Sequence, residues 1–272
     1  MWENLKKDEL DKAYNNSLAV ANSAEIIEAW VQASSQVRER LKGELDISYG
    51  SHLRQSYDYF SAGDSSPIIV YIHGGFWQFR SKDDFSFIAP PLLDLGVSVA
   101  ILGYRLAPDA AMDQIVSDIR VGLNAIEKKV RSERGFFPGF HLLGWSAGAH
   151  LAASALDQAN VNGGLCISGV YDLEPIRNCY VNDKLQLNRE TSLGNSPILK
   201  TNHFGKRMDL FVGSAELPHM QEQTIRFYEY RKQNLQPGGF QLLNDFNHYT
   251  IFDELTGVDG AIRKVIKKRV LG

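Results

Sequence analysis

The most informative motif of the chain is the pentapeptide Gly144-Trp145-Ser146-Ala147-Gly148, which has the pattern G-x-S-x-G. A short strand-forming run at 141–143 precedes it, and an Ala-rich helical stretch at 147–156 follows it. A serine on a sharp turn between a strand and a helix brings the residues two positions away into close contact, so those positions must be glycine. The motif in this context predicts a turn that presents Ser146 as a nucleophile.

Short apolar runs alternate with amphipathic helical stretches on both sides of this motif. Such alternation is typical of a parallel sheet covered by helices on both faces. Residues 45–49 and 56–60 predict an antiparallel edge hairpin, and the first forty residues predict a helical lead-in. We therefore expect an α/β protein with the α/β-hydrolase fold and a mostly parallel central sheet. Strands are predicted at 68–72, 97–103, 141–143, 165–168, 208–212 and 240–243, and helices over 115–130 and 221–232.

One polar segment, 174–205, interrupts this alternation and separates two predicted strands by more than a crossover requires. We expect it to form a small cap or lid insertion near the active site. No internal repeat or low-complexity tract is present, so a single domain over 1–272 is expected.

A second glycine-containing loop, His73-Gly74-Gly75-Phe76-Trp77, follows the strand predicted at 68–72. Two glycines let the backbone turn its N–H groups toward a reacting carbonyl, as in oxyanion loops of the HGG type. The expected oxyanion donors are the backbone amides of Gly75, Phe76 and Ala147. His73 is expected to brace the loop rather than to act chemically.

The partners of Ser146 follow from chain order, which in this fold runs nucleophile, acid, histidine. His248 lies after the last predicted strand and is the only histidine beyond position 219, so it is the predicted general base. The acid is less determined. Glu216, in the loop after 208–212, qualifies, and Asp172, after 165–168, is the alternative, because either carboxylate could orient the imidazole.

Composition argues against several other functions. The net charge of −3 is spread over 29 basic and 32 acidic residues, which disfavours nucleic acid, and no apolar segment is long enough to span a membrane. Dinucleotide, P-loop and metal-ligand motifs are missing, so we expect no cofactor and no metal. Cys166 and Cys179 form no CxxC pair and the N-terminal stretch is no signal peptide, so a cytoplasmic location is expected. The expected partner is a small-molecule substrate, and a homodimer is left open.

Motifs distributed along nearly the whole chain carry a resemblance to a known family. The chain resembles the kynurenine formamidase (arylformamidase) branch of the α/β hydrolases. The shared motifs include Asp8-Glu9-Leu10-Asp11-Lys12-Ala13-Tyr14-Asn15, Tyr49-Gly50, His73-Gly74-Gly75-Phe76-Trp77-Gln78, Ser81-Lys82, Gly144-Trp145-Ser146-Ala147-Gly148-Ala149-His150-Leu151, Ser168-Gly169-Val170-Tyr171-Asp172-Leu173-Glu174-Pro175, Asn195-Ser196-Pro197 and Asn247-His248-Tyr249.

This resemblance implies Ser146, Glu216 and His248 as the catalytic triad and gives Asp172 a structural role. It also implies cleavage of N-formyl-L-kynurenine to L-kynurenine and formate, a step of tryptophan breakdown, through a formyl-enzyme on Ser146. Three positions depart from the animal enzymes, which usually have Tyr at Phe76, His at Trp145 and Asp at Glu216. The last departure lengthens the acid by one methylene, so its loop must compensate.

Three further residues are candidates for contact with the substrate. Trp77 and Trp145 could stack on an aromatic ring, and His150 lies one turn beyond Ser146 on the same predicted helix. For each of them, packing in the core is the alternative. Two other functions also stay open: a carboxylesterase that acts on small acyl esters with the same triad, and a catalytically silent binding protein on the same scaffold.

Overall fold

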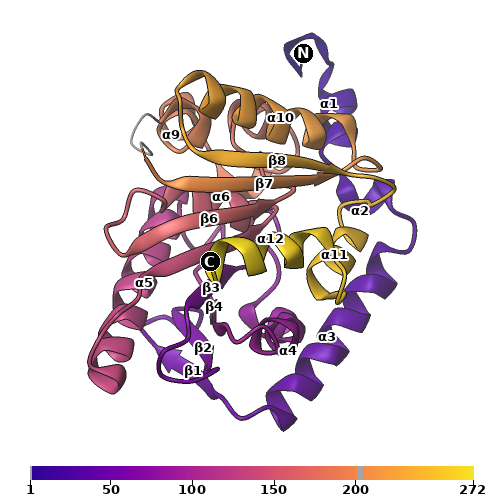
Figure 1. Cartoon of the computed structure of the whole chain (residues 1–272). Coiled ribbons are helices and arrows are strands. Elements are labelled where there is room, and N and C mark those ends of the chain that lie inside the picture. The colour runs from indigo at the N-terminus through magenta and orange to yellow at the C-terminus, as the bar shows by residue number, and fades with distance from the viewer. Residues whose placement is uncertain (1, 201–204) are drawn as a thin grey trace.

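Short, mostly apolar runs form the central strands of one eight-stranded sheet (Figure 1). The computed structural model describes residues 2–200 and 205–272. The strand order is β1-β2-β4-β3-β5-β6-β7-β8, and β3 to β8 are mutually parallel, whereas β1 and β2 form an antiparallel edge. This sheet confirms the predicted α/β-hydrolase fold class. The strands are β1 (Glu44–Ser48), β2 (Ser56–Phe60), β3 (Ile68–Ile72), β4 (Ser98–Leu102), β5 (Phe140–Trp145), β6 (Val161–Ile167), β7 (Arg207–Gly213) and β8 (Gly238–Leu243).

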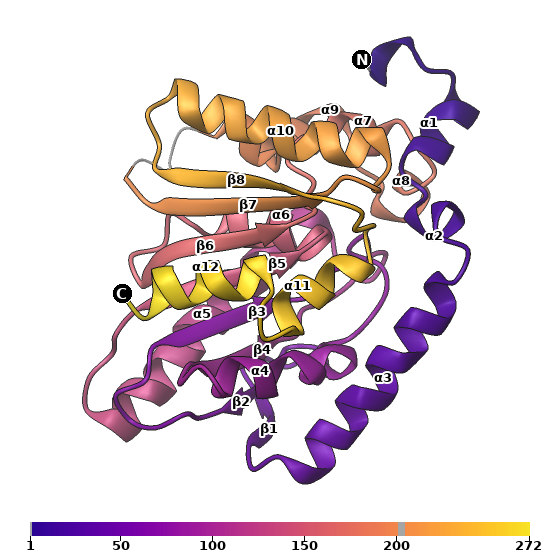
Figure 2. The same cartoon turned by 45° about the vertical axis from the view of Figure 1, so that its right-hand side comes forward.

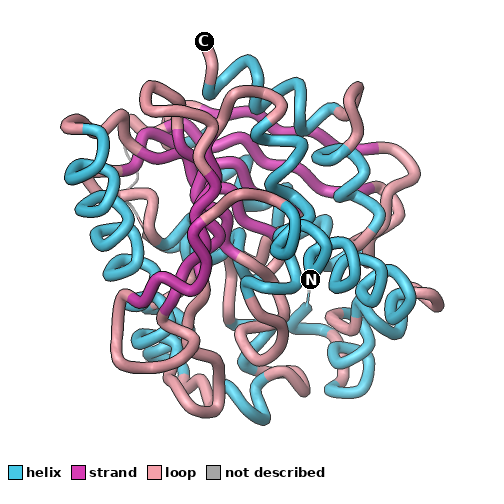
Figure 3. Tube along the Cα trace, turned by 90° about the horizontal axis from the view of Figure 1, so that it is seen from below, coloured by secondary structure: helices cyan, strands magenta, loops and turns pink. Residues whose placement is uncertain are grey.

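Helices cover both faces of the sheet, because the central strands are apolar on both sides (Figures 2 and 3). Alternate residues of β3 show this: Val70 and Ile72 pack into one core, and Ile69 and Tyr71 into the other. The first core contains α5 (Met112–Arg134), α6 (Ala147–Ser154) and α10 (Pro218–Gln233). The second contains the 3₁₀ helix η2 (Lys82–Ile88), α4 (Ala89–Leu93), η4 (Thr250–Phe252), α11 (Asp253–Thr256) and α12 (Ala261–Val270).

The N-terminal helices form a layer along one side of the molecule, beyond the ends of the strands (Figures 1 and 2). After η1 (Trp2–Asn4), this layer consists of α1 (Lys7–Ala13), α2 (Asn16–Ala19) and α3 (Ser23–Arg40). The predicted helical lead-in is therefore confirmed. Trp30 of α3 packs against the core at Phe252 and meets Trp145 edge-on.

The segment expected as a cap folds as short helices between β6 and β7. These are α7 (Glu174–Arg177), α8 (Asn182–Leu185), α9 (Arg189–Gly194) and η3 (Pro197–Leu199). Residues 201–204 of the expected insertion lie outside the described residues. None of the described helices is both long and apolar enough to cross a bilayer.

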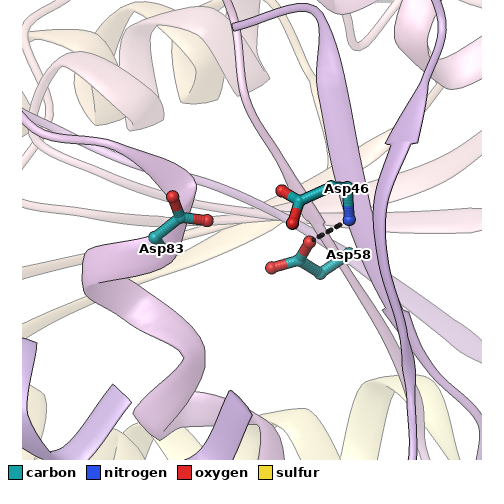
Figure 4. Close-up of side chains that lie close together, drawn as sticks. All are labelled: Asp46, Asp58 and Asp83. Carbon is teal, nitrogen blue, oxygen red and sulfur yellow. Dashed lines mark hydrogen bonds between the residues drawn. The ribbon is translucent and has the colours of Figure 1, made fainter. Parts of the chain in front are cut away.

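An ion-pair cluster around the buried residues Asp58 and Lys82 links α3 and η2 to the edge hairpin. Asp46 and Asp58 lie on the neighbouring strands β1 and β2, and Asp83 faces them from η2 (Figure 4). Lys82 Nζ lies 2.6 Å from an oxygen of Asp46 and 2.7 Å from an oxygen of each of the other two. Arg38 of α3 also contacts all three carboxylates. Burial lowers the pKa of Lys82, but its three carboxylate partners outweigh this and raise it overall.

We predict that Lys82→Met destabilises the protein by about 3 kcal/mol, because the buried carboxylate of Asp58 loses a cation at close range. Urea unfolding at neutral pH measures this loss. Lys128→Met is the matched control, since Lys128 is an exposed lysine of α5, and it should change the free energy of unfolding by less than about 0.5 kcal/mol. Equal effects of the two substitutions would show that the cluster does not stabilise the fold.

Candidate active site

The predicted turn between strand and helix is present at Ser146. This residue follows β5 directly and adopts φ 56° and ψ −121°, a left-handed backbone conformation that costs free energy for a non-glycine residue. A Cβ atom on Gly148 would lie 1.9 Å from the carbonyl oxygen of Ile72, and one on Gly144 would lie 2.3 Å from that of Gly148. Both glycines are therefore required for close backbone approach.

Three side chains from distant parts of the chain form a continuous hydrogen-bonded row. Ser146 lies after β5, Glu216 after β7 and His248 after β8, so the parallel strands bring all three to the same edge of the sheet. The Ser146 hydroxyl donates to His248 Nε2 at 3.1 Å, and His248 Nδ1–H donates to Glu216 Oε2 at 2.7 Å. All three residues are buried. The imidazole thus presents an unprotonated Nε2 to the hydroxyl, which is the geometry of a general base.

Glu216, rather than Asp172, is the carboxylate that reaches the histidine. Its second oxygen, Oε1, accepts hydrogen bonds from the amide of Gly213 at 2.8 Å and from the hydroxyl of Ser168 at 2.5 Å. Asp172 instead accepts from the amide of Glu174 and faces Arg226 at 3.7 Å. The loop after β7 therefore gives the longer glutamate side chain the reach it needs.

The loop that carries His248 is held by Trp145. The indole Nε1 of Trp145 donates to the backbone carbonyl of His248 at 2.9 Å, and the two rings lie 5.0 Å apart. Trp145 therefore links the end of β5 directly to the C-terminal loop.

The glycine loop after β3 has an unusual backbone. Gly75 (φ 113°), Phe76 (φ 49°) and Trp77 (φ 58°) all have positive φ, and a Cβ atom on Gly75 would lie 2.2 Å from the carbonyl oxygen of Phe79. Within the described residues, no acceptor pairs with the amides of Gly75, Phe76 or Ala147. The loop thus provides free backbone donors close to the nucleophile.

His73 lies beneath this loop and braces it. Its Nδ1–H donates to the carbonyl of Gly74 at 2.7 Å, and its ring stacks on Tyr104 at 4.3 Å. The Tyr104 hydroxyl donates to the carbonyl of His73 at 2.7 Å. Burial lowers the pKa of His73 to about 4.

A largely aromatic pocket opens onto Ser146 and His248. It encloses about 600 Å³, the open space at its mouth included. The N-terminal layer supplies one wall through Asn16, Ser17, Ile27 and Trp30, and the segment between β6 and β7 contributes Tyr180. The rest of the lining consists of Gly75, Phe76, Phe79, Arg80, Trp145 and Tyr249.

The structure corrects two of the expected substrate contacts. Trp145 lines the pocket, but Trp77 and His150 of α6 do not, because both are completely buried in the core. Trp77 Nε1 donates to His150 Nδ1 at 3.2 Å, and His150 Nε2–H donates to the carbonyl of Asn195 at 2.7 Å. Burial lowers the pKa of His150 to about 3. These two residues therefore tie the loop after β3 to the segment before β7.

The cluster of Asp46, Asp58 and Asp83 is the one group of described acidic side chains with a spacing that suits a metal ion (Figure 4). Its centre is already filled by the ammonium group of Lys82. The cluster also lines a cavity separate from the one at Ser146. We therefore assign it a structural role as an ion-pair cluster.

Known proteins resemble this chain in sequence and in structure. A family described as having the alpha/beta hydrolase fold matches residues 69–236. The kynurenine formamidase of Danio rerio is 30% identical, over 99% of this chain and 98% of that protein. The chain belongs to the kynurenine formamidase family. The kynurenine formamidase of Drosophila melanogaster is 25% identical over 89% of the chain and 88% of its own length. A crystal structure of a putative thioesterase from Silicibacter sp. superposes with a TM-score of 0.86 at 26% identity, covering 95% of this chain and 98% of that one.

Membership of the kynurenine formamidase family confirms the resemblance that the motifs indicated. Sequence reasoning nevertheless missed several residues of the site. Ser168 begins one of the family motifs and has a positive φ of 52°, yet only the structure shows its contact with Glu216. Asn16, Ser17 and Arg80 carried no recognisable signal, because their place in the pocket depends on how the N-terminal helices pack.

We predict that acid destabilises the protein through His73 and His150. Both folded-state pKa values lie below the ordinary value of 6.5, so the unfolded chain binds more protons as the pH falls below about 6.5. Each histidine should remove about 2 kcal/mol of stability between pH 7 and pH 5. Urea unfolding across this range measures the slope. The slope should be shallower in His150→Gln and unchanged in His52→Gln, an exposed control. A wild-type slope in His150→Gln would contradict the prediction.

Proposed function

We propose that the protein is an arylformamidase that hydrolyses N-formyl-L-kynurenine to L-kynurenine and formate. The observation that carries this proposal is the hydrogen-bonded row of Ser146, His248 and Glu216, of which Ser146 and His248 line an aromatic pocket. The identity of the substrate is inferred from the relatives named kynurenine formamidase, which match this chain over most of their length. A planar aryl group suits the walls formed by Trp30, Phe76 and Trp145.

The reaction begins with formation of a formyl-enzyme. His248 Nε2 takes the proton of Ser146 as its Oγ attacks the formyl carbon, and Glu216 stabilises the imidazolium that results. The oxyanion is held by the amides of Gly75, Phe76 and Ala147. Each such donor contributes about 3 kcal/mol to transition-state stabilisation in related chemistry. The C–N bond then breaks as the imidazolium gives its proton to the departing arylamine nitrogen.

Water completes the reaction by the same proton path in reverse. It enters the position that the arylamine has left and loses a proton to His248 Nε2 as its oxygen attacks the formyl carbon. The ester bond to Ser146 then breaks, formate leaves, and the serine oxygen regains its proton from His248. The enzyme is thereby restored without any group beyond its own side chains and water.

We also propose a cytoplasmic location, which the state of the two cysteines supports. Cys166 and Cys179 are both buried and form no disulfide. Such unpaired thiols suit a reducing compartment.

We predict that the purified protein cleaves N-formyl-L-kynurenine, and that Ser146→Ala lowers kcat by at least about 10⁴-fold because it removes the nucleophile. A fluorophosphonate probe should label the wild type and not this variant, which tests the nucleophile independently of substrate. p-Nitrophenyl acetate is the comparison substrate. Turnover of the ester without detectable cleavage of the formamide would favour the carboxylesterase alternative, and the absence of labelling would favour the catalytically silent scaffold.

We predict that Ser168→Ala lowers kcat/KM by about tenfold, because Glu216 loses a charge-assisted hydrogen bond and orients His248 less well. Steady-state kinetics, normalised to the fraction of sites labelled by the probe, measure this effect. Ser154→Ala is the matched control, since Ser154 is equally buried and its hydroxyl has no hydrogen-bond partner among the described residues. A similar loss in both variants would show that Ser168 does not position Glu216.

A further inference from the structure

One polar side chain in the pocket wall lacks the partners that its burial demands. Asn16, the first residue of α2, is 3% exposed, and neither its Oδ1 nor its Nδ2 has a hydrogen-bond partner among the described residues. A buried polar group without a hydrogen-bond partner destabilises the folded protein. Because Asn16 lines the same pocket as Ser146, a bound ligand can supply both missing partners.

The same pocket contains a cation that forms no ion pair. Arg80 is half-buried in the lining, and no described carboxylate lies within ion-pair distance of it. Asp84, outside the lining, is near enough that the charge of Arg80 opposes the rise that burial causes in its pKa. Its backbone has φ 74°, and Arg54 Nη1 donates to its carbonyl at 2.9 Å, which fixes the point from which the side chain extends. The positive charge of Arg80 opposes the rise that burial causes in the pKa of the neighbouring pocket residue Tyr249.

The rest of the lining offers this cation no counter-charge. Among the described residues around the pocket, none is Asp or Glu. An arginine in a partly desolvated aromatic pocket favours an anionic ligand, and its planar fork matches a carboxylate in a bidentate contact. Asn16 offers both an acceptor for an ammonium group and a donor for an oxygen.

We propose that Arg80 and Asn16 recognise the free α-amino-acid end of the substrate. Arg80 pairs with the α-carboxylate, and Asn16 Oδ1 accepts from the α-ammonium group while Nδ2 donates to an oxygen at the same end. The aromatic walls hold the ring between this end and Ser146. The inference rests on the proposed function and extends it, because it assigns preference for an amino-acid-bearing formanilide to two residues outside the triad.

A matched pair of substrates tests this recognition. N-formyl-L-kynurenine and formanilide carry the same scissile bond, but formanilide lacks the amino-acid end. We expect Arg80→Met to lower kcat/KM at least about tenfold more for N-formyl-L-kynurenine than for formanilide, mainly through KM. Asn16→Leu should act in the same direction by at least about threefold. Arg80→Lys, which keeps the charge and loses the fork, should give an intermediate effect.

The controls separate recognition from a general loss of structure. All rates are normalised to sites labelled by the fluorophosphonate probe. Arg189→Met, which removes an exposed arginine on α9 outside the pocket, should leave the ratio of the two substrates at the wild-type value. The proposal is overturned if Arg80→Met and Asn16→Leu change both substrates by the same factor, or if they change neither.

Product inhibition gives a readout that does not need formamide cleavage. With p-nitrophenyl acetate as substrate, L-kynurenine should inhibit the wild type, and its inhibition constant should rise at least about tenfold in Arg80→Met. 2-Aminoacetophenone, which lacks the amino-acid end, should show a smaller change. If the wild type cleaves the ester and neither formamide, the proposed function fails. The inhibition constants then decide separately whether Arg80 recognises an amino-acid end.

Discussion

The close backbone contact between Gly148 and Ile72 is the constraint on which the rest of the site depends. Because Gly148 has no side chain, the helix α6 can begin directly against the end of β3. This close approach forces Ser146 into its left-handed conformation. The same approach places the first amide of α6 beside the glycine loop that follows β3. Backbone packing thus sets the positions of the nucleophile and of the proposed oxyanion donors. Strand β7 brings Glu216, and strand β8 brings His248, to the same place.

Most of the fold could be predicted because the strands are continuous apolar runs that match buried parallel strands. The run at 68–72 coincides with β3. Two strands begin earlier than predicted, and for the same reason. β6 begins at Val161, four residues before its predicted start, and β8 begins at Gly238, two residues before its predicted start. Both hidden starts contain paired glycines, which have low strand propensity. Close approach of the neighbouring strand explains them, since a Cβ atom on Gly238 would lie 2.0 Å from the carbonyl oxygen of Met208.

Two residues of the candidate site were predictable from the sequence. The G-x-S-x-G motif indicates the strained turn at Ser146, and chain order indicates His248. The choice between Glu216 and Asp172 needed either the family resemblance or the coordinates, because loop composition does not show which carboxylate reaches the imidazole. The direction of a side chain was not predictable. His150 follows Ser146 on the same helix and Trp77 belongs to the glycine loop, yet both side chains are buried in the core. The pocket residues from α2 and α3 could not be predicted from the sequence either, because their position depends on how these helices pack against the rest of the fold.

The wall supplied by α2 and α3 comes from a part of the chain that holds none of the triad residues. Residues 69–236, the stretch shared with α/β hydrolases at large, hold the serine, the glycine loop and the glutamate, whereas Asn16, Ser17, Ile27 and Trp30 come from a segment before it. Exchanges in that segment can reshape the cavity without touching a strand or the strained turn. This wall of the pocket can therefore be changed apart from the catalytic framework, and an engineer who wishes to admit a different leaving group can redesign it first.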